Sequence, residues 1–196
     1  MRSGRIYKKF RAANGKSVIL RSLKWEDLDA ALDLVRGLVD DRASDPGFGI
    51  LLDKKLTREE EAEWLAKQLV AIEKGDVTSV AAEVDDRLIA NSEATRGSFE
   101  DVRDHGHLGI VVAREYRSTG IGTEMLRTLL KECTKDGLKT VELQVLTTNP
   151  RALALYERLG FVRVGVIAKK VHRGRRFIDT VLMSTELRHG RNKKSR

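Results

Sequence analysis

Two hydrophobic periods alternate along the chain, and each change of period marks an expected change of secondary structure. Short runs that are apolar at every second residue, or throughout, predict strands, whereas apolar residues three or four apart predict helices. Strands are expected at residues 17–23, 77–84, 87–95, 105–113, 139–146, 161–171 and 175–187. Helices are expected at residues 24–39, 57–75, 120–137 and 149–160.

The order of these elements predicts one domain built on a single sheet. Strands follow one another directly between residues 77 and 113, and one strand-helix-strand unit, expected to be right-handed, spans residues 105–146. We therefore predict an α/β fold with a mixed, mostly antiparallel central sheet and one β-α-β crossover. The predicted domain covers residues 17–187, between a basic extension at 1–16 and a basic tail at 188–196.

Composition narrows the class of protein further. The 196 residues are 41% hydrophobic and 34% charged, which is typical of one globular domain. No apolar run approaches the roughly 20 residues that span a bilayer, and the basic N-terminus lacks the apolar segment of a secretory signal. We expect a cytoplasmic protein with no membrane partner. The single cysteine, Cys133, excludes an internal disulfide, and the four scattered histidines show no metal-ligand spacing, so no metal is expected.

The net charge of +8 is concentrated at the two ends of the chain. Seven Lys and Arg residues lie within residues 2–21, before any acid, and five follow the last acid. These twelve charges exceed the net charge, so the chain between them is acidic overall. Basic ends are usually solvated, and we do not expect a nucleic-acid partner. A nucleic-acid role would have to depend on these ends.

A glycine turn in front of a helix, in the segment EYRSTGIGTEMLRTLL (residues 115–130), is a candidate anion site. A helix start offers unpaired N–H groups, and glycine lets a phosphate approach the backbone closely. The turn lacks the GK[ST] ending of a Walker motif and the third glycine of a dinucleotide motif. It fits an Arg-x-x-Gly-x-Gly turn, with Arg117 beside N–H groups that can wrap a pyrophosphate. The alternative is a helix cap with no ligand.

A second candidate segment, NPRALALYERLGF, follows the strand at 139–146. Asn149 and Pro150 occupy favoured positions at a helix start, so capping alone explains Asn149. Tyr156 lies on the apolar stripe of this helix, and core packing alone explains it.

Together the two segments resemble the GNAT superfamily of acetyl-CoA-dependent N-acetyltransferases. VVAREYRSTGIGTEML is similar to the pyrophosphate-binding motif of that family, and NPRALALYERLGF to its following motif. The segments EEEAEWL, HLGIVV and GRRFIDTVLM resemble a branch that contains amino-acid, phosphinothricin-type and ribosomal-protein N-terminal acetyltransferases. The resemblance covers about residues 17–187 and implies a GNAT domain there, with acetyl-CoA as co-substrate. Homodimers occur in this superfamily, so a homodimer stays open.

The resemblance also implies roles for individual residues. The strand residues Ile110, Val111 and Val112 would bind the pantetheine arm as an added strand. Asn149 would contact the pantetheine side, and Tyr156 would point at the thioester sulfur and protonate the departing thiolate. The pyrophosphate would sit on the turn formed by Arg117, Ser118, Thr119, Gly120, Ile121, Gly122 and Thr123.

Direct acyl transfer needs a base, because a lysine-like amine with a pKa near 10.4 is mostly protonated at neutral pH. Ribosomal-protein acetyltransferases of this superfamily use a Glu five residues before the Asn, where this chain has Gln144. Another family position for a carboxylate holds His107, which we favour as the base, directly or through a water. His107 facing solvent is equally compatible with the pattern, and Glu83 and Glu93 are further candidates.

The acceptor is expected to be a small amine, an amino acid or a protein N-terminus. Four acids of the segment 40–55 are candidates for attracting it, although such a charge run is more often solvated: Asp40, Asp41, Asp45 and Asp53. Two other functions fit the sequence. Gln144 in place of a base is compatible with a non-catalytic acyl-CoA sensor, and the basic ends with an acetyltransferase associated with ribosomes or nucleic acid.

Overall fold

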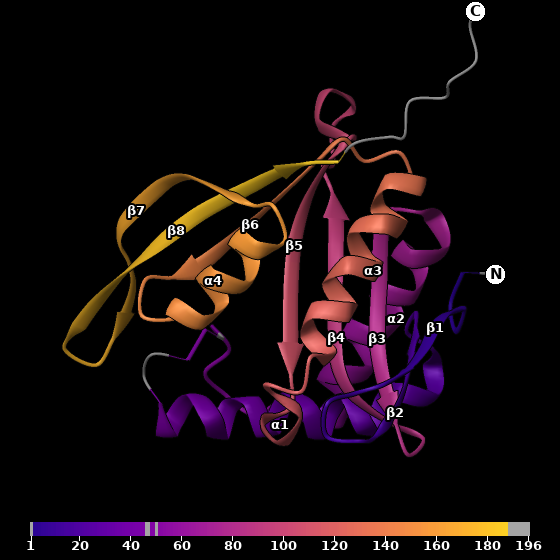
Figure 1. The fold of residues 1–196 in the computed structure, drawn as a ribbon. Coiled ribbons are helices and arrows are strands. Elements are labelled where there is room, and N and C mark those ends of the chain that lie inside the picture. The colour runs from indigo at the N-terminus through magenta and orange to yellow at the C-terminus, as the bar shows by residue number, and fades with distance from the viewer. Residues whose placement is uncertain (1, 46–47, 50, 188–196) are drawn as a thin grey trace, which may run out of the picture.

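Eight strands of the described chain form one sheet in the order β1-β2-β3-β4-β5-β6-β8-β7 (Figure 1). The computed structural model describes residues 2–45, 48–49 and 51–187. The strands are β1 (Ile6–Arg11), β2 (Ser17–Arg21), β3 (Val77–Val84), β4 (Arg87–Arg96), β5 (His105–Val112), β6 (Thr140–Leu146), β7 (Val162–Arg173) and β8 (Arg176–Glu186). Neighbours pair antiparallel except β5 and β6, which are parallel. The predicted mixed sheet with one β-α-β crossover is confirmed.

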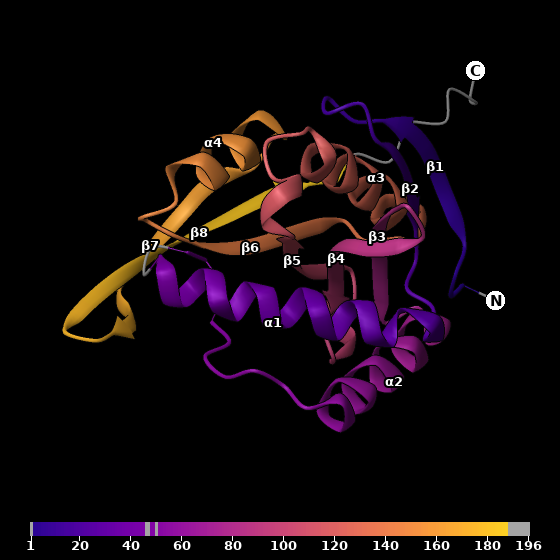
Figure 2. The same cartoon turned by 90° about the horizontal axis from the view of Figure 1, so that it is seen from below.

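Helices cover both faces of the sheet (Figure 2). They are α1 (Leu28–Ser44), α2 (Arg58–Lys74), α3 (Ile121–Lys135) and α4 (Pro150–Arg158). One hydrophobic core joins α3 and α4 to the sheet, and a second core on the opposite face joins α1 and α2 to it. Within the described ranges, no helix is long and apolar enough to cross a membrane.

The long helix α3 buries the apolar face that its sequence predicts. Met125, Leu126 and Leu129 are fully buried against the sheet. Cys133 lies on the same face, and burial raises the pKa of its thiol to about 12. Cys133 is therefore a packing residue.

Two elements extend beyond the sequence prediction. The first strand of the sheet is β1, which pairs with β2 and lies inside the segment expected to be a basic extension. Its sequence, IYKKFR, does not alternate cleanly between apolar and polar residues, because this edge strand is largely exposed. The charged side chains on such an edge discourage pairing with strands of other chains. Helix α1 continues to Ser44, five residues beyond the prediction, and its buried Asp41 is held by side chains from another element.

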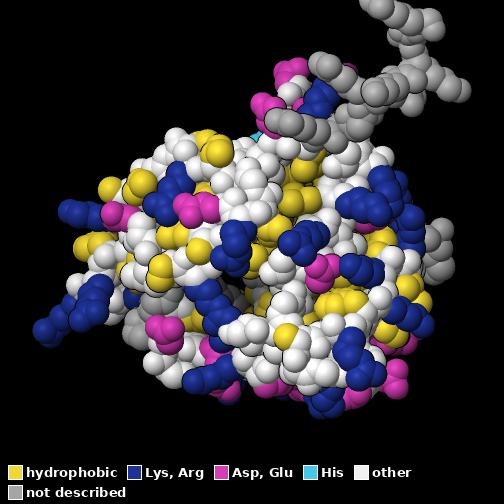
Figure 3. All heavy atoms as spheres, viewed as in Figure 1, with side chains coloured by type: hydrophobic (Ala, Val, Ile, Leu, Met, Phe, Trp, Pro, Cys, Tyr) yellow, Lys and Arg dark blue, Asp and Glu magenta, His cyan; other side chains and the backbone are white. Residues whose placement is uncertain are grey.

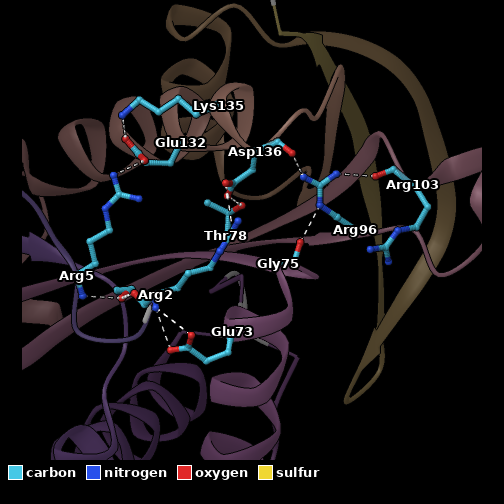
Figure 4. A network of polar contacts seen from close by, with 11 residues as sticks. Arg2, Arg5, Glu73, Gly75, Thr78, Arg96, Arg103, Glu132, Lys135 and Asp136 are labelled. Atoms are coloured by element: carbon cyan, nitrogen blue, oxygen red, sulfur yellow. Dashed lines mark hydrogen bonds and ion pairs between the residues drawn. The ribbon is translucent and has the colours of Figure 1, made fainter.

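The N-terminal residues before β1 are anchored to two helices (Figure 4). The backbone N–H groups of Arg2 and Ser3 donate to the Glu73 carboxylate on α2 at 2.9–3.0 Å. The Arg2 guanidinium lies 3.2 Å from Asp136, at the end of α3. The hydrogen bonds from the Ser3 hydroxyl and from the two N–H groups lower the pKa of Glu73 to about 2. The start of the described chain is thus tied to the domain.

A buried ion network joins β2, β3 and the turn before α1. Arg21 Nη2 lies 2.6 Å from Asp27 Oδ1, and Arg21 Nε donates to Glu83 Oε2 at 2.7 Å. All three side chains are at least nine-tenths buried. Burial alone would raise the pKa of Glu83, but the hydrogen bond and charge of Arg21 lower it overall. Glu83 is therefore held as a structural carboxylate.

Candidate functional site

Strands β5 and β6 separate after a short stretch of pairing (Figure 1). Their ladder covers only His105–Thr140, Gly106–Val141 and His107–Glu142. Beyond it, β5 continues to Val112 paired only with β4, so Ile110, Val111 and Val112 border the gap. Alternate N–H and C=O groups of a strand point to each side, and those on the β6 side are open to an added strand. The carbonyl of Val112 already accepts from Arg117 Nε at 2.9 Å.

The open strand leads into the glycine turn at the start of α3. Ser118 and Gly120 have φ of 68° and 86°, and Gly120 occupies the N-cap position, where a Cβ would meet nothing within 4 Å. In the described chain, the N–H groups of residues 118–123 donate no backbone hydrogen bond. The turn is thus a row of free donors at the positive end of a helix, which suits an anion.

Two arginines lie near this turn, and they point in different directions. Arg117 turns away from it, because its Nη2 donates to Asp41 Oδ2 at 2.5 Å and its guanidinium stacks 4.3 Å from the Phe48 ring centroid. Arg151, on the first turn of α4, contacts the Ser118 hydroxyl. Arg117 thus joins α1 to the turn through Asp41, and Arg151 lies beside the turn at Ser118. The placement of Arg117 at an anion stays a prediction.

Helix α4 places Asn149 and Tyr156 beside the gap. Asn149 Oδ1 accepts from the N–H of Ala152 at 3.1 Å, which confirms the cap and leaves the Nδ2 donor for other partners. Tyr156 is 8% exposed and packs edge-on to Phe161 with ring centroids 5.8 Å apart. Burial raises the pKa of its phenol to about 12, so Tyr156 stays protonated at neutral pH. In Figure 3 the surface between α4 and α3 is hollowed, with hydrophobic side chains exposed along it and Lys and Arg side chains at its border.

A cavity of about 310 Å³ lies on the opposite face of the sheet, against α1 and α2. Its apolar lining includes Leu34, Leu38, Leu52, Leu56, Trp64 and Leu88. Glu93 and Asn91 of β4 form part of the wall, together with Gly109 and Val111 of β5. Glu93 pairs directly with Gly109, where an added Cβ would meet nothing within 4 Å. The cavity therefore reaches the strand that borders the gap.

Comparison with known proteins identifies the family of this fold. The model of the Acetyltransferase (GNAT) family matches residues 43–161, more than half of the chain. The chain belongs to the GNAT family. This confirms the resemblance that the glycine turn and the Asn149 segment indicate.

Individual relatives match this GNAT chain over shorter segments. It is 41% identical over 54 residues to N-alpha-acetyltransferase MAK3 of Arabidopsis thaliana, which is 28% of each protein. It is 42% identical over 52 residues to the [Ribosomal protein bS18]-alanine N-acetyltransferase of Escherichia coli K12, which is 26% of this chain and 35% of that protein. The chain thus spans about a third of the length of these curated relatives.

The fold extends over nearly the whole chain. A GNAT superfamily phosphinothricin acetyltransferase from Sinorhizobium meliloti, solved in complex with AcCoA, superposes with a TM-score of 0.75. That likeness covers 90% of this chain and 92% of the other at 23% sequence identity. It shows a shared architecture.

The three candidate bases of this GNAT chain lie in different surroundings. His107 lies on the exposed part of β5, with Nδ1 3.6 Å from Glu142 Oε1, and does not line the cavity. Glu83 is committed to Arg21. Glu93 lines the cavity, its Oε2 is buried, and burial raises the pKa of its carboxyl, partly offset by a hydrogen bond from Asn91. Gln144 faces Lys170, whose ammonium contacts its Oε1.

The acids of the segment 40–55 do not line this cavity. Asp40 pairs with Lys55 at 2.9 Å, Asp41 pairs with Arg117, and Asp53 is exposed. The acidic groups at the cavity are Glu93 and Glu61, and Glu61 is not among the site residues predicted from the sequence. The spacing of Glu61 from Leu65 and Ile72 places it on the buried face of α2, and this could have identified it. Glu61 also follows two other acids in the first turn of the helix, so its sequence position alone suggests an exposed acid.

Proposed function

We propose that this protein is an acetyl-CoA-dependent N-acetyltransferase that moves an acetyl group directly to a primary amine. The observation that carries the proposal is the unpaired end of β5, which leads straight into free N–H groups at the start of α3 and borders a cavity on the other face. A thioester on a long arm with a pyrophosphate matches this layout. Family membership and the two N-acetyltransferase relatives support the same chemistry.

The coenzyme would be held by backbone groups and by one cation. Its pantetheine arm would pair with Ile110 and Val111 as an added strand, and Asn149 Nδ2 would donate from the α4 side. The pyrophosphate would take N–H groups of the turn 118–123, with Arg151 adding charge. Arg117 would act as a positioning residue, because its guanidinium is already bound to Asp41 and to the carbonyl of Val112.

Proton removal from the acceptor is assigned to Glu93. The carboxylate lines the cavity, and its raised pKa brings it nearer to neutrality, where a general base is most effective. The freed amine attacks the thioester carbon. A tetrahedral oxyanion forms there and is stabilised by N–H groups at the open end of β5. His107 faces solvent beside Glu142 and is the weaker candidate.

The last step is loss of the thiolate as the tetrahedral intermediate collapses to the amide. Tyr156 keeps its proton, because its pKa is about 12. A phenol this weak as an acid does not give its proton fully to an ordinary thiolate, whose conjugate thiol has a pKa near 8.5. We therefore assign Tyr156 a hydrogen bond to the departing sulfur. As the C–S bond breaks, the second proton of the nitrogen passes to the thiolate, and the first proton, held by Glu93, returns to solvent.

The test measures thiol release from acetyl-CoA with free amines, amino acids and N-terminal peptides against a control without acceptor. The proposal expects release that depends on one acceptor class, with the acetylated amine found by mass spectrometry. Acetyl-CoA that raises the melting temperature without any acceptor-dependent release would instead favour an acyl-CoA sensor.

A further inference from the structure

The cavity against α1 and α2 offers hydrogen-bond acceptors that nothing satisfies. Glu61 Oε1, Asn91 Oδ1 and Glu93 Oε2 are buried, and each lacks a hydrogen-bond partner among the described residues. Glu61 is 1% exposed and Asn91 is 9% exposed, so both side chains are shielded from bulk solvent. They come from two elements, α2 and β4, and all three side chains line the same cavity. Buried acceptors left unpaired are costly, so their presence indicates a ligand that brings donors.

The charge of the cavity excludes anionic ligands. Among the described residues that line it there is no Lys, Arg or His, and two of the polar residues are carboxylic acids. Burial raises the pKa of the Glu61 carboxyl, which is the expected response of an acid with no cation beside it. A ligand carboxylate placed here would lose its water without gaining a counter-ion. The remaining lining is aliphatic except for Trp64, so the ligand body is apolar.

We propose that the acceptor amine has an apolar body, carries no carboxylate next to the amine, and presents a second N–H donor that Glu61 or Asn91 accepts. The N-terminus of a peptide with an apolar first residue has this chemistry, because its carboxyl is an amide. A free amino acid does not. This inference rests on the proposed function, since it takes the cavity to be the acceptor site. It favours peptide-like acceptors over the free amino acids that the sequence left open.

Three probes with the same apolar side chain and amine test the second N–H donor and the carboxylate separately. Leucinamide has the apolar body, the amine and a second N–H donor; 3-methylbutylamine lacks that donor; leucine has the carboxylate. Binding of each to the full chain loaded with coenzyme A is measured by calorimetry, and acetylation of each from acetyl-CoA by product mass. We expect leucinamide to bind and react about 100-fold or more better than leucine, because polar sites reject ligands that leave their groups unpaired. The affinity and the rate of acetylation of 3-methylbutylamine should lie between those of leucinamide and leucine.

A pair of variants assigns the selection to Glu61. Glu61→Gln removes the buried charge at nearly constant size, and it should reduce the leucinamide-to-leucine ratio about tenfold. Glu63→Gln is the matched control, because Glu63 lies on the same helix but is exposed and paired with Lys67. The ratio is measured within each variant, so a loss of stability alone does not change it.

The outcomes separate this inference from the proposed function. Leucine that binds as well as leucinamide, no binding of any probe, or an unchanged ratio in Glu61→Gln would overturn the inference. Selective binding of leucinamide without acetylation of any probe would overturn the catalytic proposal and leave the cavity selection standing.

Discussion

Glu93 and Tyr156 face opposite sides of the sheet, yet burial raises the pKa of both groups. A raised pKa makes a carboxylate a stronger base, and it keeps a phenol protonated so that its O–H remains a hydrogen-bond donor. The strand β5 lies between them, and its open end is the place where a thioester would meet an amine. Two side chains thus acquire complementary proton chemistry from the same physical cause, loss of water.

Replacing Glu93 tests the base. Glu93→Gln should lower kcat by roughly 10²–10⁴-fold, the usual contribution of a general base. In the wild type, log kcat/KM should be level between the pKa of Glu93 and that of the amine, and it should fall with a slope of about one below the pKa of Glu93, because the protonated carboxyl cannot take the proton of the ammonium. In the variant, log kcat/KM should rise with a slope of about one up to the pKa of the amine, because the reaction then depends on the free amine.

His107 supplies the comparison for this experiment. His107→Asn should change kcat by less than about threefold, since its ring faces solvent beside Glu142. A large loss in His107→Asn with little effect in Glu93→Gln would return the base to His107.

Tyr156 is tested by removing one oxygen. Tyr156→Phe keeps the contact with Phe161 but removes the donor to the thiolate, so kcat should fall by roughly 10–100-fold. The Kd for acetyl-CoA, measured by calorimetry, should stay within about threefold. Unchanged turnover would remove Tyr156 from the chemical step.

At this scale, the sequence predicts features that depend on neighbouring residues, but it does not predict side-chain orientations that depend on distant ones. Asn149 could be read as a cap because capping is local. The pairing of Arg117 with Asp41 could not be predicted, because Asp41 lies 76 residues away along the chain. Glu93 and His107 differ in burial only through α1 and α2, whose packing no local pattern contains.

At the scale of elements, the helices and strands with clean periods were predictable. Helix α2 has its capping box at Thr57 and ends at Gly75, both readable from the sequence. Strand β1 was not, because an edge strand with Lys and Arg side chains has no buried face to impose a period. The separation of β5 from β6 leaves no pattern either, since β5 remains paired with β4 throughout.

Helix α4 contributes a cation to the turn before α3, and this contact can be tested. Arg151→Ala should weaken acetyl-CoA binding by roughly 10–100-fold, as expected for loss of a hydrogen bond to a charged group. The acetylated pantetheine fragment of the coenzyme, which lacks the pyrophosphate, should bind the variant and the wild type equally. Arg158→Ala, in the last turn of the same helix, is the control for charge and should have little effect. Equal losses in the two variants would point to a general electrostatic effect.

At the scale of the whole molecule, the ion network of Arg21 joins β2, which precedes α1 in the sequence, to β3, which follows α2. Glu83→Gln should lower the free energy of unfolding by about 1–1.5 kcal/mol, because the amide oxygen still accepts from Arg21 but the negative charge that strengthens this buried bond is lost, while Asp27 still neutralises Arg21. Chemical denaturation at pH 7 measures this difference.

The same difference should depend on pH with a definite sign. The pKa of Glu83 is lower in the folded chain than the ordinary value of 4.5, so its contribution is fully present above about pH 4.5. The contribution is lost as pH falls through the folded pKa. The stability gap between wild type and Glu83→Gln should therefore be constant near neutrality and narrow in acid. A gap that widens in acid would contradict the assigned pairing.

The three residue pairs that join β5 to β6 have a further consequence for the lifetime of the protein. If the coenzyme completes this sheet, the folded state gains about 2.7 kcal/mol when its concentration is a hundred times the Kd. The melting temperature should then rise with acetyl-CoA, as it would for a ligand at any site of the folded chain. Amide hydrogen exchange at Gly109–Val112 should also slow, and this local change would not be expected if the coenzyme bound elsewhere. In a starved cell with little acetyl-CoA, this chain should be degraded faster than in a fed one, so that its abundance follows the supply of its own co-substrate.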